Sequence, residues 1–183
     1  MKLFNEKLEC LGLKSLQEAS KPIVAALVSE KPILFISDNP VAIATLSQKI
    51  SWGIHEIESE VPQGLGVYDA RKAEKRDLFG AAAESNSGVD ADAEPGGIES
   101  IANKRFIFIN DLANAPESMK TIWTDVLGPE KIEGHSTENL RHIIACMGEV
   151  KKKKNTLDPT LANAFGSIVP IPSDGALDFA GNI

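Results

Sequence analysis

The sequence predicts an α/β protein, in which a three-layer arrangement places a parallel sheet of about five strands between helices. Short apolar runs alternate along the chain with segments of helical spacing, which is typical of a parallel sheet covered on both faces. With 183 residues, 43% of them hydrophobic, the chain can bury one sizeable core. We therefore expect a single domain over 1–183, with N-terminal helices in 1–30, a mobile loop at 80–98 and a tail at 174–183.

Four apolar runs and one alternating, more exposed segment at 54–59 are the candidate strands, and three segments between them have helical patterns. A continuous apolar run such as "KRFIFIN" indicates a central parallel strand, whereas Pro170 places the last strand at an edge. The helix at 115–128 has Pro and Glu early and Gly at its end, which are start and stop signals. The expected strands are 31–37, 54–59, 104–110, 140–148 and 167–173, and the expected helices are 39–51, 115–128 and 158–166.

Composition excludes several classes of protein. A net charge of −7 and a pI near 5 argue against general nucleic-acid binding. No apolar run approaches the roughly 18 residues that span a membrane, and the N-terminal segment is too charged for a signal peptide. Two cysteines, Cys10 and Cys146, are too few for a disulfide framework and are expected to be buried reduced thiols. These features predict a cytoplasmic protein without a membrane partner.

The histidines and the acidic loop do not predict a metal site. His55, His135 and His142 are far apart, without metal-ligand or catalytic spacing, and are expected at the surface or at strand edges. The 80–98 loop contains acids, but the glycine and distal glutamate of a calcium loop are out of register. We therefore expect no metal.

The most specific motifs lie in 104–148 and 157–173, and they resemble the AAA+ ATPases, closest to the MoxR and magnesium-chelatase branch. The resemblance rests on the order and spacing of several short motifs and covers residues 12–173. It implies a P-loop NTPase-like sheet in the order 5-1-4-3-2. The matching residues are Leu112, Ala115 and Pro116 after one strand, Gly134 in a turn, Leu157, Asp158, Pro159, Leu161 and Phe165 in the later motif, and the segment "RDLFG" at 76–80.

The resemblance places the phosphate-binding loop directly after the first strand, where the required residues are replaced. Its glycine positions are Ser37, Pro40 and Ala42, its lysine position is Ile43 and its magnesium-binding hydroxyl position is Ala44. Pro40 has no amide donor and Ile43 has no charge, so this loop lacks what a phosphate needs. We therefore expect no nucleotide cofactor.

The other catalytic positions of the pattern are replaced too. Asn110 lies at the position of the magnesium-ordering aspartate, and Asp111 at that of the water-activating glutamate. The sensor position falls at Gly148, and Ala164 replaces an arginine. The chain ends ten residues after "IPS", so no helical lid is expected within it. A natural lidless protein and a shortened sequence both remain open.

These replacements predict a non-catalytic AAA+-like module, a pseudoenzyme, that binds another protein as an adaptor, a regulator or an inactive subunit. The partner could be an AAA+ ATPase subunit, and the candidate partner-binding residues on this acidic chain are Lys151, Lys152, Lys153 and Lys154. A solvated loop is the simpler interpretation of these lysines.

Two other functional interpretations stay open, beside a generic parallel α/β domain. One is an NTP-binding protein or NTPase with unorthodox chemistry, using Thr45, Lys49, Asp111 and Glu149. The other is a nucleic-acid accessory protein, for example in phage or plasmid replication, that uses the lysine run.

Overall fold

The computed structural model describes residues 17–37, 50, 65–79, 100–101, 104–128, 140–148 and 157–171. In chain order the elements are α2 (Gln17–Val28), β1 (Ile33–Ile36), β2 (Leu65–Asp69), α4 (Lys75–Phe79), β3 (Phe106–Asn110), the 3-10 turn η4 (Leu112–Asn114), α5 (Glu117–Leu127), β4 (His142–Met147), α6 (Pro159–Asn163) and β5 (Ser167–Pro170).

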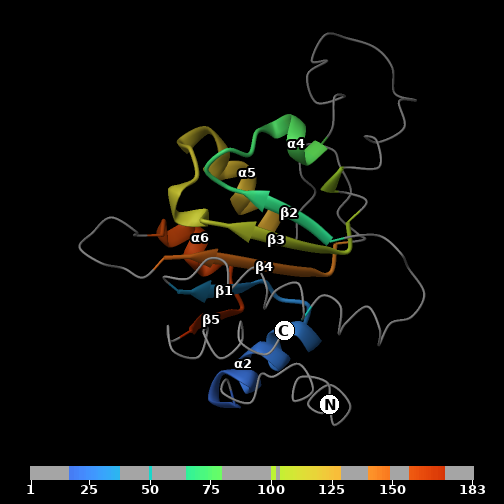
Figure 1. Ribbon diagram of the computed structural model, residues 1–183, viewed down its shortest axis with the longest axis vertical. Coiled ribbons are helices and arrows are strands. Elements are labelled where there is room, and N and C mark those ends of the chain that lie inside the picture. The colour runs from blue at the N-terminus through green and yellow to red at the C-terminus, as the bar shows by residue number, and fades with distance from the viewer. Residues whose placement is uncertain are drawn as a thin grey trace, which may run out of the picture.

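The strands form one five-stranded parallel sheet in the order β2-β3-β4-β1-β5 (Figure 1). This is the predicted order, 5-1-4-3-2, read from the opposite edge. The three central strands are the continuous apolar runs of the sequence, because a strand covered on both faces has no need for alternating polar residues. β5 lies at an edge, as predicted, where the missing N–H of Pro170 is tolerated.

α5 begins and ends where the sequence indicates, whereas α6 begins as predicted but ends at Asn163, three residues before the expected stop at Gly166. α5 starts after Pro116, carries Glu117 in its first turn and stops before Gly128. α6 is capped by Asp158, whose Oδ1 accepts a hydrogen bond from the backbone N–H of Thr160 at 2.7 Å. Hydrogen bonds from Thr160 hold the pKa of Asp158 below its usual value.

One face of the sheet packs against α5 in a large apolar core. Trp123 of α5 is fully buried, and its ring meets that of Tyr68 edge to face with 6.1 Å between centroids. At the other end of the sheet, α2 packs beside β1 and β5 (Figure 1). The core on the α5 side includes Leu34, Tyr68, Leu78, Phe79, Ile101, Ile107, Ile109, Leu112, Met119, Trp123, Val126, Leu127, Ile143, Met147 and Leu161.

The amino end of the sheet contains an ion pair between distant parts of the chain. Glu30 follows α2 in a left-handed conformation, with φ 52°. Its Oε1 accepts a hydrogen bond at 2.6 Å from Nη1 of Arg141, which precedes β4. The pair therefore links the entry to β1 with the entry to its neighbour β4.

The second strand is a correction to the sequence prediction. The edge position beside β3, expected for 54–59, belongs to Leu65–Asp69, while 54–59 itself lies outside the described residues. This strand gave a weak signal because it contains Gly66 and because Val67 is 63% exposed. Gly66 is needed here, since a Cβ at this position would lie 2.9 Å from Cε2 of Tyr68.

Two further predictions concern single side chains. Cys146 is buried, as expected. His142, expected at the surface or a strand edge, is instead buried at the start of the central strand β4, with its ring centroid 6.2 Å from that of Phe106. The imidazole packs there as a flat, largely apolar ring.

Several expectations fall outside the described residues. These are the N-terminal helices up to residue 16, the 80–98 loop, the 174–183 tail, Cys10, His55, Gly134, His135, and the 39–51 helix apart from the buried Ile50. Within the described part of the chain, no helix is long and apolar enough to cross a membrane.

Candidate functional site

The carboxyl ends of four neighbouring strands bring four side-chain positions into one row. The strand register pairs Asp69 with Asn110 and Phe35 with Cys146. Asn110 and Cys146 each follow directly after the paired residues Ile109 and Ala145. In open parallel sheets this edge is where ligands bind. The row across β2, β3, β4 and β1 is therefore the candidate site.

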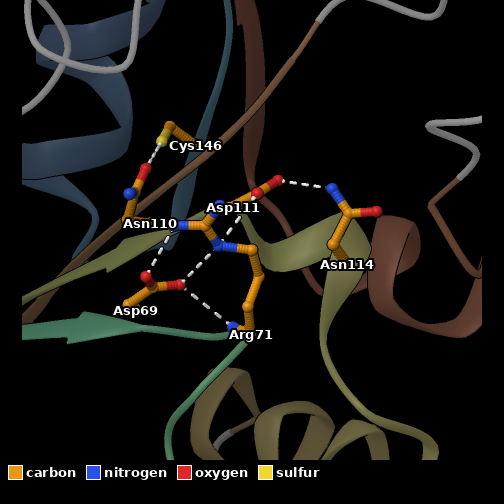
Figure 2. Close-up of polar contacts among 6 residues, drawn as sticks. All are labelled: Asp69, Arg71, Asn110, Asp111, Asn114 and Cys146. Carbon is orange, nitrogen blue, oxygen red and sulfur yellow. Dashed lines mark hydrogen bonds and ion pairs between the residues drawn. The ribbon is translucent and has the colours of Figure 1, made fainter.

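In the middle of this row, a thiol and an amide bind each other. Sγ of Cys146 donates a hydrogen bond to Oδ1 of Asn110 at 3.0 Å (Figure 2). Burial raises the pKa of the Cys146 thiol to about 11, and the nearby charges of Asp111 and Asp69 act in the same direction. The thiol is therefore protonated at neutral pH and can donate this bond.

Asp111 turns the chain away from β3. Its backbone is left-handed, with φ 56° and ψ 44°, a conformation that aspartate tolerates better than most residues. Its Oδ1 accepts a hydrogen bond from Nδ2 of Asn114 at 2.7 Å, and its backbone oxygen accepts one from the N–H of Asn114 at 3.1 Å. Asp111 and Asn114 thus enclose the short turn η4.

Arg71, in the turn after β2, joins the two carboxylates of the site. Its Nη2 and Nε bind the two oxygens of Asp69 at 2.7 and 2.9 Å. The same Nε lies 3.3 Å from Oδ2 of Asp111 (Figure 2). The side-chain hydrogen bonds hold the pKa of Asp69 below its usual value and raise the pKa of Arg71.

The residues present do not fit a magnesium-bound nucleotide of the expected kind. Such a site needs a carboxylate at the end of β3 to order the metal. Asn110 offers only a neutral amide oxygen, which already accepts from Cys146, and both oxygens of Asp111 have partners. Across the described ranges, no three His, Cys, Asp or Glu residues are grouped so that they could hold a metal ion.

Three other predicted positions lie within the described residues. Ser37 follows β1, is buried, and donates its backbone N–H to the oxygen of Met147 at 2.9 Å. Gly148 directly follows β4, so it lies at the same edge of the sheet as Asn110. Ala164 is the last residue of the α6 region and donates its N–H to Leu161. The positions outside the described residues are Pro40, Ala42, Ile43, Ala44, Thr45, Lys49, Glu149, Lys151, Lys152, Lys153 and Lys154.

Sequence reasoning missed three members of this site, Asp69, Arg71 and Asn114, and it also missed the contact that Cys146 makes there. Asp69 was missed because β2 was missed. A usable signal existed, since "YDA" and "IND" both place an acid at the end of an apolar segment. The contact between Cys146 and Asn110 follows from the parallel register of β3 and β4.

Comparison with known proteins finds similarity to solved structures in the fold. No protein-family model matches the chain, and no curated protein does either. A crystal structure of a "putative ATPase" from Cytophaga hutchinsonii matches 100% of this chain and 56% of its own, with TM-score 0.60 and 9% identity. A closed-state structure of Hsp104 with ATPγS and FITC casein matches 91% and 36%, with TM-score 0.61 and 13% identity. A mutant RuvB from Thermotoga maritima matches 93% and 45%, with TM-score 0.53 and 13% identity.

These matches define the class of fold. Together with the parallel order of the strands, they show that the chain has the fold of an AAA+ core, a parallel α/β sheet of the P-loop NTPase type. The chain spans between about a third and somewhat over half of the length of the structures that it matches. At identities of 13% or less, the likeness shows the fold and leaves the chemistry to the residues of the site.

Proposed function

We propose that this chain is a non-catalytic AAA+-like module that works by binding another protein, as an adaptor, a regulator or an inactive subunit of a larger assembly. The observation that carries the proposal is the state of the β3 terminus. Asn110 binds the Cys146 thiol, and Asp111 binds Arg71 and Asn114, so the polar groups at this edge are occupied with one another.

The contacts of Asp111 argue against a role as general base. A base that activates water needs a free carboxylate oxygen within hydrogen-bonding reach of that water. Here Oδ1 accepts from Asn114 and Oδ2 faces the Arg71 guanidinium. An aspartate is also one methylene shorter than the glutamate that the AAA+ pattern has at this position. These features support the proposal that Asp111 occupies a former catalytic position and no longer acts as a base.

Three finer parts of the proposal rest on the sequence. The order of the motifs supports the MoxR and magnesium-chelatase branch, and the replaced residues at Pro40, Ile43 and Ala44 support loss of nucleotide binding. The acidic composition and the two thiols support a cytoplasmic location. Hsp104, one of the matched structures, was solved with ATPγS. We propose that nucleotide binding of this kind has been lost here.

Calorimetric titration with Mg-ATP is the decisive test. We expect no binding at physiological concentrations and no phosphate release above that of a buffer blank. A dissociation constant below about 100 μM, which corresponds to more than about 5 kcal/mol, would overturn the proposal. The matched control is Asp111→Asn: phosphate release that this substitution abolishes would identify a surviving catalytic base and favour the NTPase interpretation.

The lysine run at 151–154 is the proposed contact with the partner. A basic patch on an acidic chain accelerates encounter with an acidic surface, and salt weakens the effect. A partner that copurifies with the chain would be identified, purified and titrated against the wild type and a variant with Ser at 151–154. Weaker binding and a smaller salt slope are expected for the variant. Equal slopes would leave the run as a solvated loop, and loss of DNA retention would favour the nucleic-acid interpretation.

A further inference from the structure

The carboxyl edge of the sheet contains its own permanent positive charge. Asp69 ends β2 and Asp111 follows β3, so parallel pairing brings two carboxylates to neighbouring strand ends. Both face one atom, Nε of Arg71, at 2.9 and 3.3 Å. Two like charges this close repel each other unless a cation lies between them.

The guanidinium is well placed for this role. Arg71 also donates its backbone N–H to Oδ1 of Asp69 at 3.1 Å, so the turn after β2 holds the side chain close to that carboxylate. Figure 2 shows the side chain running from this turn to a position between Asp69 and Asp111. Within the described part of the chain, the ion pairs of Asp69 and Asp111 are both made with Arg71. Arginine stays charged at any physiological pH.

We propose that Arg71 is the built-in cation of this site, so that the edge of the sheet keeps its shape without a divalent metal. The inference rests on the proposed non-catalytic function, because a magnesium-bound nucleotide would compete with the guanidinium for the same acids. Arg71 is a positioning residue in this account. It holds the turn after β2 against the left-handed start of η4, through Asp69 on one side and Asp111 on the other.

Removal of the guanidinium should expose a latent affinity for metal. Carboxylate and amide oxygens are ligands that Mg²⁺, Mn²⁺ and Ca²⁺ accept, and both acids would be left without their cation. In Arg71→Met the length of the side chain is kept and the charge is lost. We expect its thermal midpoint to fall by about 2–4 °C, and millimolar MnCl₂ to restore roughly half of this loss or more.

The experiment measures thermal unfolding with and without MnCl₂, in the absence of any nucleotide. The wild type and Arg71→Lys, which keeps a charge, should not respond to the metal. Arg71→Met combined with Asp111→Asn should lose the response. Arg76→Met is the matched control, since Arg76 pairs only with the exposed Glu74 within the described residues, at 3.0 Å, and its loss should create no response to manganese.

Two results would overturn the inference. Stabilisation of the wild type by MnCl₂ alone would mean that the site takes a metal beside Arg71. An Arg71→Met variant whose thermal midpoint does not change with manganese would mean that the two acids do not form a cation-binding site. Neither result involves ATP, so failure here is distinguishable from failure of the proposed function, which would appear as nucleotide binding by the wild type.

Discussion

The thiol of Cys146 donates to the side-chain oxygen of Asn110 across 3.0 Å, and this contact joins the carboxyl ends of β4 and β3. Both groups are neutral at physiological pH, since burial raises the pKa of the thiol to about 11. An aspartate in place of Asn110 would put a charge into the same contact. The carboxyl edge of the sheet is therefore held by a neutral contact between Cys146 and Asn110 in its centre, and by the ion pairs of Arg71 next to it.

We expect Cys146 to make the protein less stable at alkaline pH. The unfolded thiol has a pKa near 9.0 and the folded one a pKa of about 11, so the folded state keeps its proton longer. The contribution of the protonated Cys146 thiol to the free energy of unfolding is complete below pH 9. It is lost as the pH rises toward 11, by at most about 3 kcal/mol. Urea unfolding across this range, for the wild type and Cys146→Ala, measures it.

The alanine variant should lose stability less steeply above pH 9, since lysines and tyrosine titrate equally in both proteins. Parallel pH profiles would contradict the raised pKa. A Cys10→Ser background leaves Cys146 as the remaining thiol, and this thiol should react with an aromatic disulfide reagent much faster in urea than in the native state.

Substitutions of Asp111 should separate two contributions to stability, the charge of its side chain and its left-handed backbone conformation. Asp111→Asn loses the partly exposed pair with Arg71 but keeps a residue that tolerates φ 56°, so we expect less than about 1 kcal/mol of destabilisation. Asp111→Ala should lose about 1–2 kcal/mol more. Alanine has a Cβ but no polar group that could hydrogen-bond locally, so the left-handed conformation is more strained for it than for Asp or Asn. Asp111→Gly, which is free of this strain, is the control. Equal losses in Asn and Ala variants would show that the backbone conformation is not the cause.

Continuous apolar runs made the central strands predictable. β1, β3 and β4 are buried on both faces, so nearly every residue in them is apolar and the sequence pattern is strong. β2 lies at an edge with Val67 exposed and Gly66 in its middle, and its sequence therefore resembles a loop. His142 was misjudged for the converse reason, since a polar residue at the start of a central strand is buried by its neighbours.

Trp123 provides a test of the core. Its indole N–H is buried and has no hydrogen-bond acceptor within the described part of the chain. Trp123→Phe loses apolar area but also removes an unsatisfied donor, so we expect a loss of only about 1–2 kcal/mol. Trp123→Ala leaves a cavity beside Tyr68 and should cost about 3–5 kcal/mol. Chemical denaturation of both variants measures the difference, and equal losses would contradict the unsatisfied donor.

Two glycines should respond in opposite ways to alanine. At Gly66 a new Cβ would lie 2.9 Å from the ring of Tyr68 and 3.2 Å from Cγ2 of Ile107, so Gly66→Ala should lose about 1–3 kcal/mol. At Gly128 the nearest atoms lie at 3.4 and 3.5 Å and the backbone is extended. Gly128→Ala should therefore be neutral or gain up to about 1 kcal/mol. A tolerated Gly66→Ala in thermal unfolding would mean that the Tyr68 ring can move.

The candidate site was predictable only in part. Asn110 and Asp111 could be identified because the resemblance to the AAA+ pattern places catalytic positions there, at the carboxyl end of an apolar run, where a parallel sheet holds its ligands. Arg71 could not, because its partner Asp111 follows a different strand, and only the register of β2 against β3 brings the two residues together. The replaced loop at Pro40, Ile43 and Ala44 lies outside the described residues, so the loss of phosphate binding stays a prediction.

The sheet order has a consequence for how the protein is made. β1 is synthesised early, yet both of its neighbours, β4 and β5, come from the last third of the described elements. The ion pair between Glu30, which precedes β1, and Arg141, which precedes β4, joins residues that are 111 positions apart in the sequence. Contacts this distant in sequence slow folding, because the chain must close a long loop before they form. On the ribosome, we expect β1 to emerge first and to remain unpaired until translation reaches the strands that flank it.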